Sequence, residues 1–364
     1  MAHPIDDASI KRITWEERTY PLGTSLRHST ADTPALEEVY CHVDFSDGTS
    51  GISEVRGNGE YATGETTLRI VEALDFLRAR ISELPSLAAT LAALSSRSRL
   101  AAMAVDVARC DALATAAGLP LYRWLGAARD VKTWPTHLPI PFCDRETALA
   151  RAAWARDCGF TRVKLRLGEG PSADGKRVEL VRSVLGEGIE LIADANGGWS
   201  LREAEQMLPV LDSNAVTWIE QPVSTVDELQ ELCLRERQVR IRADESVHDT
   251  FDIEDLARRH AADGVHLKLE KAGTLAHLRE QVDAARSWGL AVALGQMDQS
   301  RLGCAVTAHL AAGLGIGEAE LWGCADILHD DSGPLECVSG SVVLPQGPGI
   351  GVALDRTQTQ RIRA

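Results

Sequence analysis

Apolar and polar positions follow two different patterns along the chain, and the change falls near residue 130. Before it, residues 10–20 and 37–45 alternate as half-buried strands do, and residues 64–118 carry apolar positions at helical spacing. After it, short apolar runs alternate with amphipathic helical stretches. The pattern predicts an α+β region followed by repeated strand–helix units.

Residues 21–34 join the first two predicted strands as a long polar segment with few packing residues. We expect a loop here. Loops of this length within a compact domain often act as lids over a functional site.

The apolar runs after residue 130 have the length of buried strands, and helical stretches such as 176–186, 201–212 and 226–236 separate them. Buried strands that alternate with helices form parallel sheets, and seven or eight such units favour a closed (β/α)8 barrel. An open doubly wound sheet is the weaker alternative, because no Gly-x-Gly-x-x-Gly motif follows any run. The predicted strands are 162–167, 190–195, 216–220, 240–243, 264–269, 290–294 and a run near Leu321.

Composition narrows the classes of protein. The chain has 364 residues, of which 45% are apolar, and a formal net charge of −15. This length supports two domains, and the acidic balance disfavours nucleic acids and anionic membranes as partners. The eight cysteines occur singly, without metal-type spacing. Because we find neither a secretory signal nor an apolar run of the roughly 20 residues that span a bilayer, we expect a soluble, cytoplasmic protein.

Charged side chains stand where the predicted strands end. Lys164, Asp194, Glu220, Asp244 and Lys268 follow one another at gaps of 30, 26, 24 and 24 residues, about one strand–helix unit each. The carboxyl ends of barrel strands surround one cavity, so these side chains should converge. Any one of them alone would more often be a helix cap or a surface ion pair, but five in barrel order favour a functional site.

The three carboxylates of Asp194, Glu220 and Asp244 come from successive predicted strands. Carboxylate oxygens without histidine or cysteine suit a hard divalent cation, so we expect Mg²⁺ rather than Zn²⁺. Such a cation would lie beside a small-molecule carboxylate substrate whose α-proton is removed, a step that forms a doubly charged enolate.

Three cationic side chains accompany this predicted metal site. Lys164 and Arg166 share one strand face, because side chains alternate with period two, and Lys268 ends a later strand. Together they would stabilise the enolate. A lysine crowded by other cations has a lowered pKa, which makes Lys268 the candidate general base.

Several motifs carry a resemblance to a known family. They are Val-Lys164-Leu-Arg166-Leu-Gly, Ala-Asp194-Ala-Asn196-Gly, Trp-Ile-Glu220-Gln-Pro, Ala-Asp244-Glu-Ser and Leu-Lys268-Leu-Glu-Lys271-Ala-Gly. In this order and spacing they resemble the enolase superfamily, and within it the branch of muconate-lactonising enzymes and dipeptide epimerases, which carries a sixth-strand lysine. The resemblance covers nearly the whole chain, from Glu54 in a Gly-x-Ser-Glu motif to the ending Leu-Pro345-Gln-Gly-Pro-Gly-Ile-Gly351-Val.

The resemblance implies an α/β fold, a modified (β/α)8 TIM barrel of the enolase type with an α+β capping domain. It predicts a capping domain over 1–128, a barrel domain over 129–327 and a C-terminal segment, 328–364, that returns to the capping domain. Lid loops 21–34 and 55–63 would close over the barrel mouth, and the family resemblance also implies a homo-oligomer. The lid residues expected nearest the substrate are Arg27, His28, Arg56 and Tyr61, and for each the alternative is a solvated loop residue.

Arg166 departs from the family pattern, because members that use two bases carry a second lysine there. A guanidinium, with a pKa above about 12, is a poor base but a good partner for a carboxylate or enolate oxygen. The favoured reaction therefore uses Lys268 alone to remove the proton α to a carboxylate, through an enolate that Mg²⁺ stabilises, followed by β-elimination, as in a dehydratase, or by cycloisomerisation. The alternative is a racemase or epimerase of an amino-acid derivative, in which Arg166 or a water relay replaces the second lysine.

Two further departures concern the last barrel strands. Relatives often carry Glu before Ser after the seventh strand, whereas this chain has Gln there, preceded by Asp298, which is either a relocated acid or a plain strand-end residue. Trp322 stands where dipeptide epimerases place a carboxylate that holds the substrate ammonium group. Its ring offers an apolar or cation-binding face, which with Tyr61 could sandwich a ring or a quaternary ammonium, and core packing is the alternative. Gln296 is a further candidate substrate contact.

Two other classes of function stay open. Barrel aldolases use a strand-six lysine as a Schiff-base nucleophile, which borohydride trapping on Lys268 would reveal, but that chemistry leaves the three carboxylates unexplained. A relative that binds a carboxylate ligand without turnover would also tolerate Arg166, and a substrate screen that finds turnover would exclude it.

Overall fold

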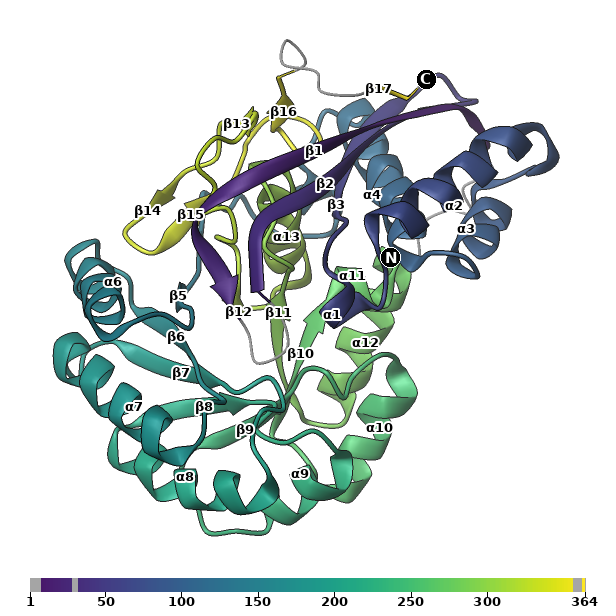
Figure 1. The fold of residues 1–364 in the computed structure, drawn as a ribbon. Helices are drawn as coiled ribbons and strands as arrows, with labels where there is room; N and C mark the ends of the chain where they lie inside the picture. The colour runs from purple at the N-terminus through teal and green to yellow at the C-terminus, as the bar shows by residue number, and fades with distance from the viewer. Residues whose placement is uncertain (1–7, 28–31, 356–361, 364) are drawn as a thin grey trace.

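The computed structural model describes residues 8–27, 32–355 and 362–363. Figure 1 shows a curved parallel sheet with helices on its outside and, above it, an antiparallel sheet flanked by helices. The predicted α/β barrel with an α+β cap is confirmed.

The capping sheet has the strand order β17-β1-β2-β3, and its members pair antiparallel. Helix α4 packs against β3 and β2 through a face of buried alanine, valine and leucine side chains. Thr66, Ser86 and Ser98 cap the three longest helices of this region, each by accepting a hydrogen bond from a backbone N–H of the first turn. The bounds are β1 (Ile10–Arg27), β2 (Asp32–Phe45), β3 (Ser50–Arg56), α1 (Glu60–Thr63), α2 (Thr67–Arg80), η1 (Ile81–Glu83), α3 (Leu87–Ser95), α4 (Arg99–Ala116) and α5 (Leu121–Trp124).

Residues 21–34 are mostly strand, so the expectation of a loop over this whole segment is wrong. β1 and β2 remain paired on both sides of a register shift that follows Pro21. The far part of this hairpin also docks on the barrel, where the Gly23 N–H donates to the Asp326 carbonyl at 2.7 Å. Backbone hydrogen bonds between distant segments therefore order a stretch whose side chains are mostly polar. The tip of the hairpin, 28–31, lies outside the described residues.

The barrel sheet has eight parallel strands in sequence order, and the strands predicted from the apolar runs are confirmed. The central residues of the strands from 162–166 to 291–295 are almost fully buried, because the barrel interior lies on one side and the outer helices on the other. The strands are β5 (Leu138–Ile140), β6 (Arg162–Arg166), β7 (Glu190–Asp194), β8 (Val216–Glu220), β9 (Arg240–Ala243), β10 (Gly264–Lys268), β11 (Ala291–Gly295) and β12 (Glu318–Ala319). The helices are α6 (Arg145–Asp157), α7 (Pro171–Leu185), α8 (Leu201–Ser213), α9 (Val226–Cys233), α10 (Thr250–Arg259), α11 (Leu269–Ala272), α12 (Leu275–Ser287) and α13 (Arg301–Leu314).

Side chains, rather than a strand ladder, join the two ends of this sheet in the described part of the chain. Thr136, just before β5, accepts a hydrogen bond at Oγ1 from the Leu321 N–H at 3.0 Å. His137 Nε2 lies 3.3 Å from Glu320 Oε1, which follows β12. These contacts bring the first and the last barrel strand together around the cavity.

The C-terminal region contacts both parts of the molecule. β17 (Ile362–Arg363) pairs with β1 of the capping sheet, and β15 (Ser341–Val343) pairs with β4 (Thr133–Pro135), the strand that precedes β5. The other short strands are β13 (Ser332–Gly333), β14 (Cys337–Val338) and β16 (Ala353–Leu354). The domain limits 1–128, 129–327 and 328–364 stay a proposal that is compatible with this arrangement.

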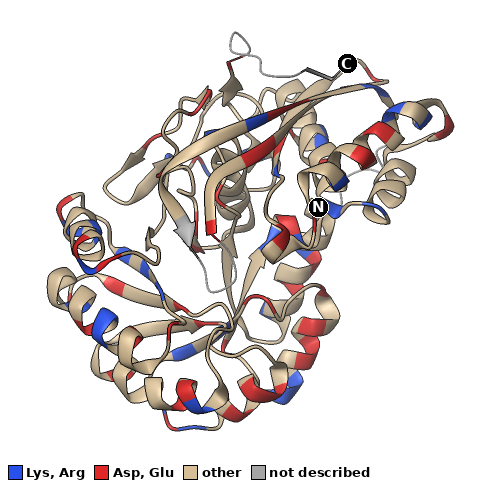
Figure 2. Ribbon diagram, viewed as in Figure 1, with Lys and Arg blue, Asp and Glu red and all other residues tan. Residues whose placement is uncertain are grey.

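Charged residues of both signs are mixed over the outer helices of the barrel, as Figure 2 shows. In the ranges that the structure covers, none of the helices is both long and apolar enough to cross a membrane.

Candidate active site

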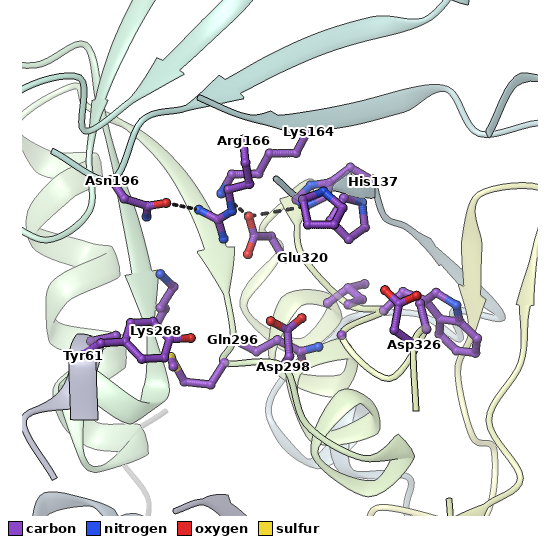
Figure 3. A pocket seen from close by; sticks show the side chains of 18 of the residues that line it. Tyr61, His137, Lys164, Arg166, Asn196, Lys268, Gln296, Asp298, Glu320 and Asp326 are labelled. Atoms are coloured by element: carbon purple, nitrogen blue, oxygen red, sulfur yellow. Dashed lines mark hydrogen bonds and ion pairs between the residues drawn. The ribbon is translucent and has the colours of Figure 1, made fainter. Parts of the chain in front are cut away.

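A pocket lies at the carboxyl ends of the barrel strands, beneath α1 of the capping domain (Figure 3). Its lining includes seven of the residues that the sequence marked as candidates: Tyr61, Lys164, Arg166, Lys268, Gln296, Asp298 and Trp322. Asp194, Glu220 and Asp244 lie deeper and are almost fully buried. The predicted convergence of the strand ends is therefore confirmed.

Lys164 lies at the centre of the buried charges. Its Nζ is 2.8 Å from Glu220 Oε1 and 3.1 Å from Asp194 Oδ2, and it also donates a short hydrogen bond to Glu320. Burial lowers the pKa of Lys164, but the surrounding carboxylates outweigh burial and raise this pKa above its usual value. Lys164 is therefore a fixed cation here.

Arg166, the last residue of β6, pairs with the last residue of β7. Its Nη1 forms an ion pair with Asp194 and donates to Asn196 Oδ1 at 2.7 Å. Asn196 in turn donates through Nδ2 to Glu245 Oε1 at 2.9 Å. Because Arg166 stays protonated at any ordinary pH, it can bind an anion in the pocket but cannot readily accept a proton.

Asp244, which follows β9, is held by two lysines. Lys268 Nζ donates to its Oδ2 at 2.5 Å, and Lys271 Nζ donates to its Oδ1 at 2.6 Å. Burial lowers the pKa of Lys268, but Asp244 and then Glu220 outweigh burial, so this pKa lies well above its usual value. The expectation of a lowered Lys268 pKa is wrong for this structure, because carboxylates rather than cations are its nearest charged neighbours.

The donor set of the predicted metal site fits a hard cation. Burial raises the pKa of Asp194, Arg166 and Lys164 lower it, and Glu220 and Asp244 are close enough to raise it again. Glu220 Oε2 is buried without a hydrogen-bond partner in the described part of the protein. Its charged neighbour there is Arg242, whose Nη1 lies 3.8 Å away, beyond hydrogen-bond distance. Three adjacent carboxylates, one with an oxygen that accepts no hydrogen bond, are an arrangement that a divalent cation can stabilise.

A histidine also accompanies these carboxylates, so the expectation of a cluster without histidine is wrong. His266 Nδ1 lies 2.7 Å from Glu220 Oε1, and one ligand atom each from Glu220, His266 and Glu320 can be grouped within 4.8 Å. His266 precedes Lys268 by two residues and therefore shares its strand face. That spacing is the signal by which the sequence could have revealed it.

Glu320 is the main site residue that sequence reasoning missed. It lies in the pocket wall, pairs with Lys164 and His137, and stands two residues before Trp322. A carboxylate just after the last barrel strand, at a spacing of two from a candidate residue, was an available signal. Glu245, next to Asp244, also lines the pocket and was not among the residues predicted from the sequence.

The predicted lid residues have different positions. Tyr61 lies in α1 and lines the pocket. Arg56 is fully buried at the end of β3, where it donates to the Asp298 carbonyl at 2.7 Å and to Asn58 Oδ1 at 2.6 Å, so it holds the cap to the barrel. Arg27 ends β1, and His28 lies outside the described residues.

A comparison with protein families shows to which family the chain belongs. The family model for the enolase C-terminal domain-like fold matches residues 147–358. The chain belongs to the enolase superfamily.

Two curated relatives within this superfamily are isomerases. The chain is 30% identical to muconate cycloisomerase 1 of Rhodococcus opacus, a match that covers 96% of this chain and 97% of that protein. It is 31% identical to the D-Ala-D/L-Ala epimerase of Cytophaga hutchinsonii, over 57% of this chain and only 56% of that protein. This enolase-superfamily chain is thus an enzyme, related to both cycloisomerases and epimerases.

The fold agrees with a solved member of the superfamily. The dipeptide epimerase of Cytophaga hutchinsonii, in complex with Mg and the dipeptide D-Ala-L-Val, superposes with a TM-score of 0.90 at 23% identity, over 98% of this chain and 99% of that one. This likeness supports the barrel and the cap of the present enolase-superfamily fold.

Proposed function

We propose that this enzyme removes the proton α to the carboxylate of a small-molecule substrate in a Mg²⁺-dependent reaction, with Lys268 as the general base. The observation that carries the proposal is the position of Lys268. It lines the pocket and at the same time contacts Asp244, one of three adjacent buried carboxylates.

Asp194, Glu220 and Asp244 would hold the Mg²⁺ ion, with His266 orienting Glu220 through the contact at 2.7 Å. Bound Mg²⁺ would supply positive charge beside the substrate carboxylate, where negative charge increases as the α-proton leaves.

The side chains divide the remaining work. Lys164 and Arg166, both cationic and both in the pocket wall, would bind the substrate carboxylate and stabilise the enolate oxygens. Lys268 can accept a proton only in its neutral form, which the Asp244 carboxylate disfavours for as long as its charge is not balanced. A cation bound to Asp244 would therefore favour the neutral form of Lys268, the form that can act as a base.

Two outcomes can follow proton removal. Cycloisomerisation or β-elimination needs only one base. This fits Arg166 on the second strand, because a guanidinium with its high pKa cannot serve as a second base. The full-length similarity to a muconate cycloisomerase supports ring chemistry. The alternative is epimerisation of an amino-acid derivative, which the epimerase relatives support equally.

Solvent exchange separates these outcomes. Incubation of candidate carboxylates with enzyme and Mg²⁺ in D₂O, followed by NMR, reports both deuterium at Cα and the product formed. Deuterium with inversion indicates an epimerase, whereas ring formation or loss of a β-substituent indicates the one-base reaction. Asp298 as an acid, homo-oligomeric assembly and a cytoplasmic location stay predictions from the sequence.

A further inference from the structure

Asp298 presents to the pocket a carboxylate that has neither an ion-pair nor a hydrogen-bond partner among the described side chains, although Arg56 and Arg166 act on it from a longer distance. Its side chain lines the pocket, and Figure 3 shows the carboxylate pointing into the space between the strand ends. Throughout residues 8–27, 32–355 and 362–363, no side chain forms an ion pair with it or donates a hydrogen bond to it. Arg56, the first cation to influence it, gives its Nη1 hydrogen bond to the Asp298 backbone carbonyl at 2.7 Å instead.

The other carboxylates of the pocket wall have partners. Asp326 forms a two-pronged ion pair with Arg151, both contacts at 2.9 Å. Glu320 pairs with Lys164, and Glu245 accepts from Asn196. Asp298 is therefore distinguished from its neighbours by its lack of a partner, not by its charge.

The surroundings of Asp298 keep its carboxylate accessible. A Cβ at Gly323 would lie 3.0 Å from Asp298 Oδ1 and 2.9 Å from its Cα, so any side chain there would crowd the acid. Trp322, beside that glycine, is half-buried in the pocket wall, and Tyr61 lines the pocket from the cap. Burial raises the pKa of Asp298 although Arg56 and Arg166 both oppose this shift, and a cation in direct contact with the carboxylate would oppose it further.

The pocket separates two cations from Asp298, although the cationic side also carries Glu320, which pairs with Lys164. Lys164 and Arg166 lie on one side and Asp298 on the other, as Figure 3 shows. Asp298 is half-buried in the pocket wall. A carboxylate that is partly withdrawn from water is destabilised when it is unpaired, and a ligand that supplies a positive charge reduces that cost. A second substrate carboxylate near Asp298 would add repulsion instead.

We propose that Asp298 binds a cationic nitrogen of the substrate, which makes the substrate a zwitterion whose carboxylate faces Lys164 and Arg166. The inference rests on the proposed function and adds the class of substrate. A primary ammonium group would use the Asp298 oxygens as hydrogen-bond acceptors, and an N-methylated one would also use the faces of Tyr61 and Trp322. In this role Asp298 is a specificity residue rather than an acid.

Calorimetric binding to the Mg²⁺-loaded protein tests this directly. The probes form matched sets on two skeletons: valine, N,N,N-trimethylvaline, 3-methylbutanoate and isopropylmalonate, and the four corresponding compounds derived from phenylalanine. We expect at least one cationic probe to bind about tenfold or more tightly than its matched monocarboxylate, and the dicarboxylate to bind most weakly. If the primary amine binds more tightly, the Asp298 carboxylate alone recognises the cationic nitrogen. If the trimethyl form binds more tightly, Asp298 recognises it together with the rings of Tyr61 and Trp322.

Asp298→Asn should abolish this preference while circular dichroism and Mg²⁺ affinity stay unchanged. Asp283→Asn, at an exposed acid on α12, is the matched control and should keep it. The inference is overturned if no cationic probe binds more tightly than its matched monocarboxylate, or if Asp298→Asn keeps the preference. Because binding needs no turnover, a protein that shows the preference but exchanges no α-proton would contradict the proposed reaction alone.

Discussion

Lys268 donates a hydrogen bond of 2.5 Å to Oδ2 of Asp244, across two neighbouring barrel strands. The same carboxylate accepts a second hydrogen bond from Lys271 at its other oxygen. One side chain thus joins the proposed base to the proposed cation site. A change in the charge of Asp244 should therefore affect both.

Asp244→Asn removes a negative charge from the three-carboxylate cluster. We expect the affinity for Mg²⁺ to fall by at least about tenfold, because a neutral amide is a weaker ligand for a hard cation. Calorimetric titration with MgCl₂ measures this directly, with Asp283→Asn as the control. Unchanged affinity would place the cation elsewhere.

Gly295, at the end of β11, leaves room for the proposed base. A Cβ at this position would overlap the His266 ring and lie 3.1 Å from Cε of Lys268. We expect Gly295→Ala to displace both side chains, to lower kcat/KM and to cost about 1–3 kcal/mol of stability, as overpacking does.

Gly188→Ala is the control for this substitution, because nothing lies within 4 Å of a Cβ there. Steady-state kinetics and thermal unfolding of the two variants make the comparison. If Gly295→Ala shows the kinetics of the control, the close packing around Lys268 has no functional consequence.

Glu54 of the capping sheet holds the start of α13 in the barrel. Its carboxylate accepts hydrogen bonds from the Ser300 and Gly303 N–H groups, each at 2.8 Å, and burial raises its pKa to about 7. A carboxyl whose pKa is raised on folding contributes stability that is complete below its unfolded pKa, about 4.3. That contribution is lost as the pH rises through about 7.

Glu54→Gln should therefore flatten the pH dependence of stability. We expect the Tm of the wild type to fall more steeply between pH 5 and pH 8 than that of the variant, beyond any constant offset. Scanning calorimetry in matched buffers measures the two slopes. Equal slopes would mean that Glu54 does not titrate in this range.

Arg166→Lys tests why a guanidinium occupies the second strand. If its high pKa restricts the enzyme to one base, a lysine there can exchange a proton on the second face of the α-carbon. We expect chiral chromatography of recovered substrate to show inversion with Arg166→Lys but not with Arg166→Met. Inversion by the wild type would contradict the one-base reaction and favour the epimerase alternative.

Much of the barrel could be predicted because its signals are local. Each buried strand is an apolar run, and period-two alternation places Lys164 with Arg166 on one face of β6. The hairpin beyond Pro21 could not be predicted in this way, because its side chains are mostly polar and the segment also docks through a contact with Asp326, about 300 residues away in the sequence.

The sequence predicts which residues form the site better than it predicts the charges that surround each of them. The positions of Asp194, Glu220 and Lys268 at strand ends follow from spacing alone. The pKa of Lys268 depends on which charges lie nearest, and that is a property of the folded site. Glu320 was missed because β12 is only two residues long and provides little apolar pattern from which to place a carboxylate.

The central claim is that Lys268 removes the α-proton, and one exchange measurement tests it most directly. Wild type, Lys268→Met and the exposed control Lys176→Met are compared in D₂O with Mg²⁺, on a carboxylate whose α-proton the wild type exchanges. We predict that Lys268→Met loses exchange by a factor of about 10² to 10⁴ while it keeps its fold and its Mg²⁺ affinity, and that Lys176→Met exchanges normally. Exchange at the wild-type rate in Lys268→Met would contradict the account.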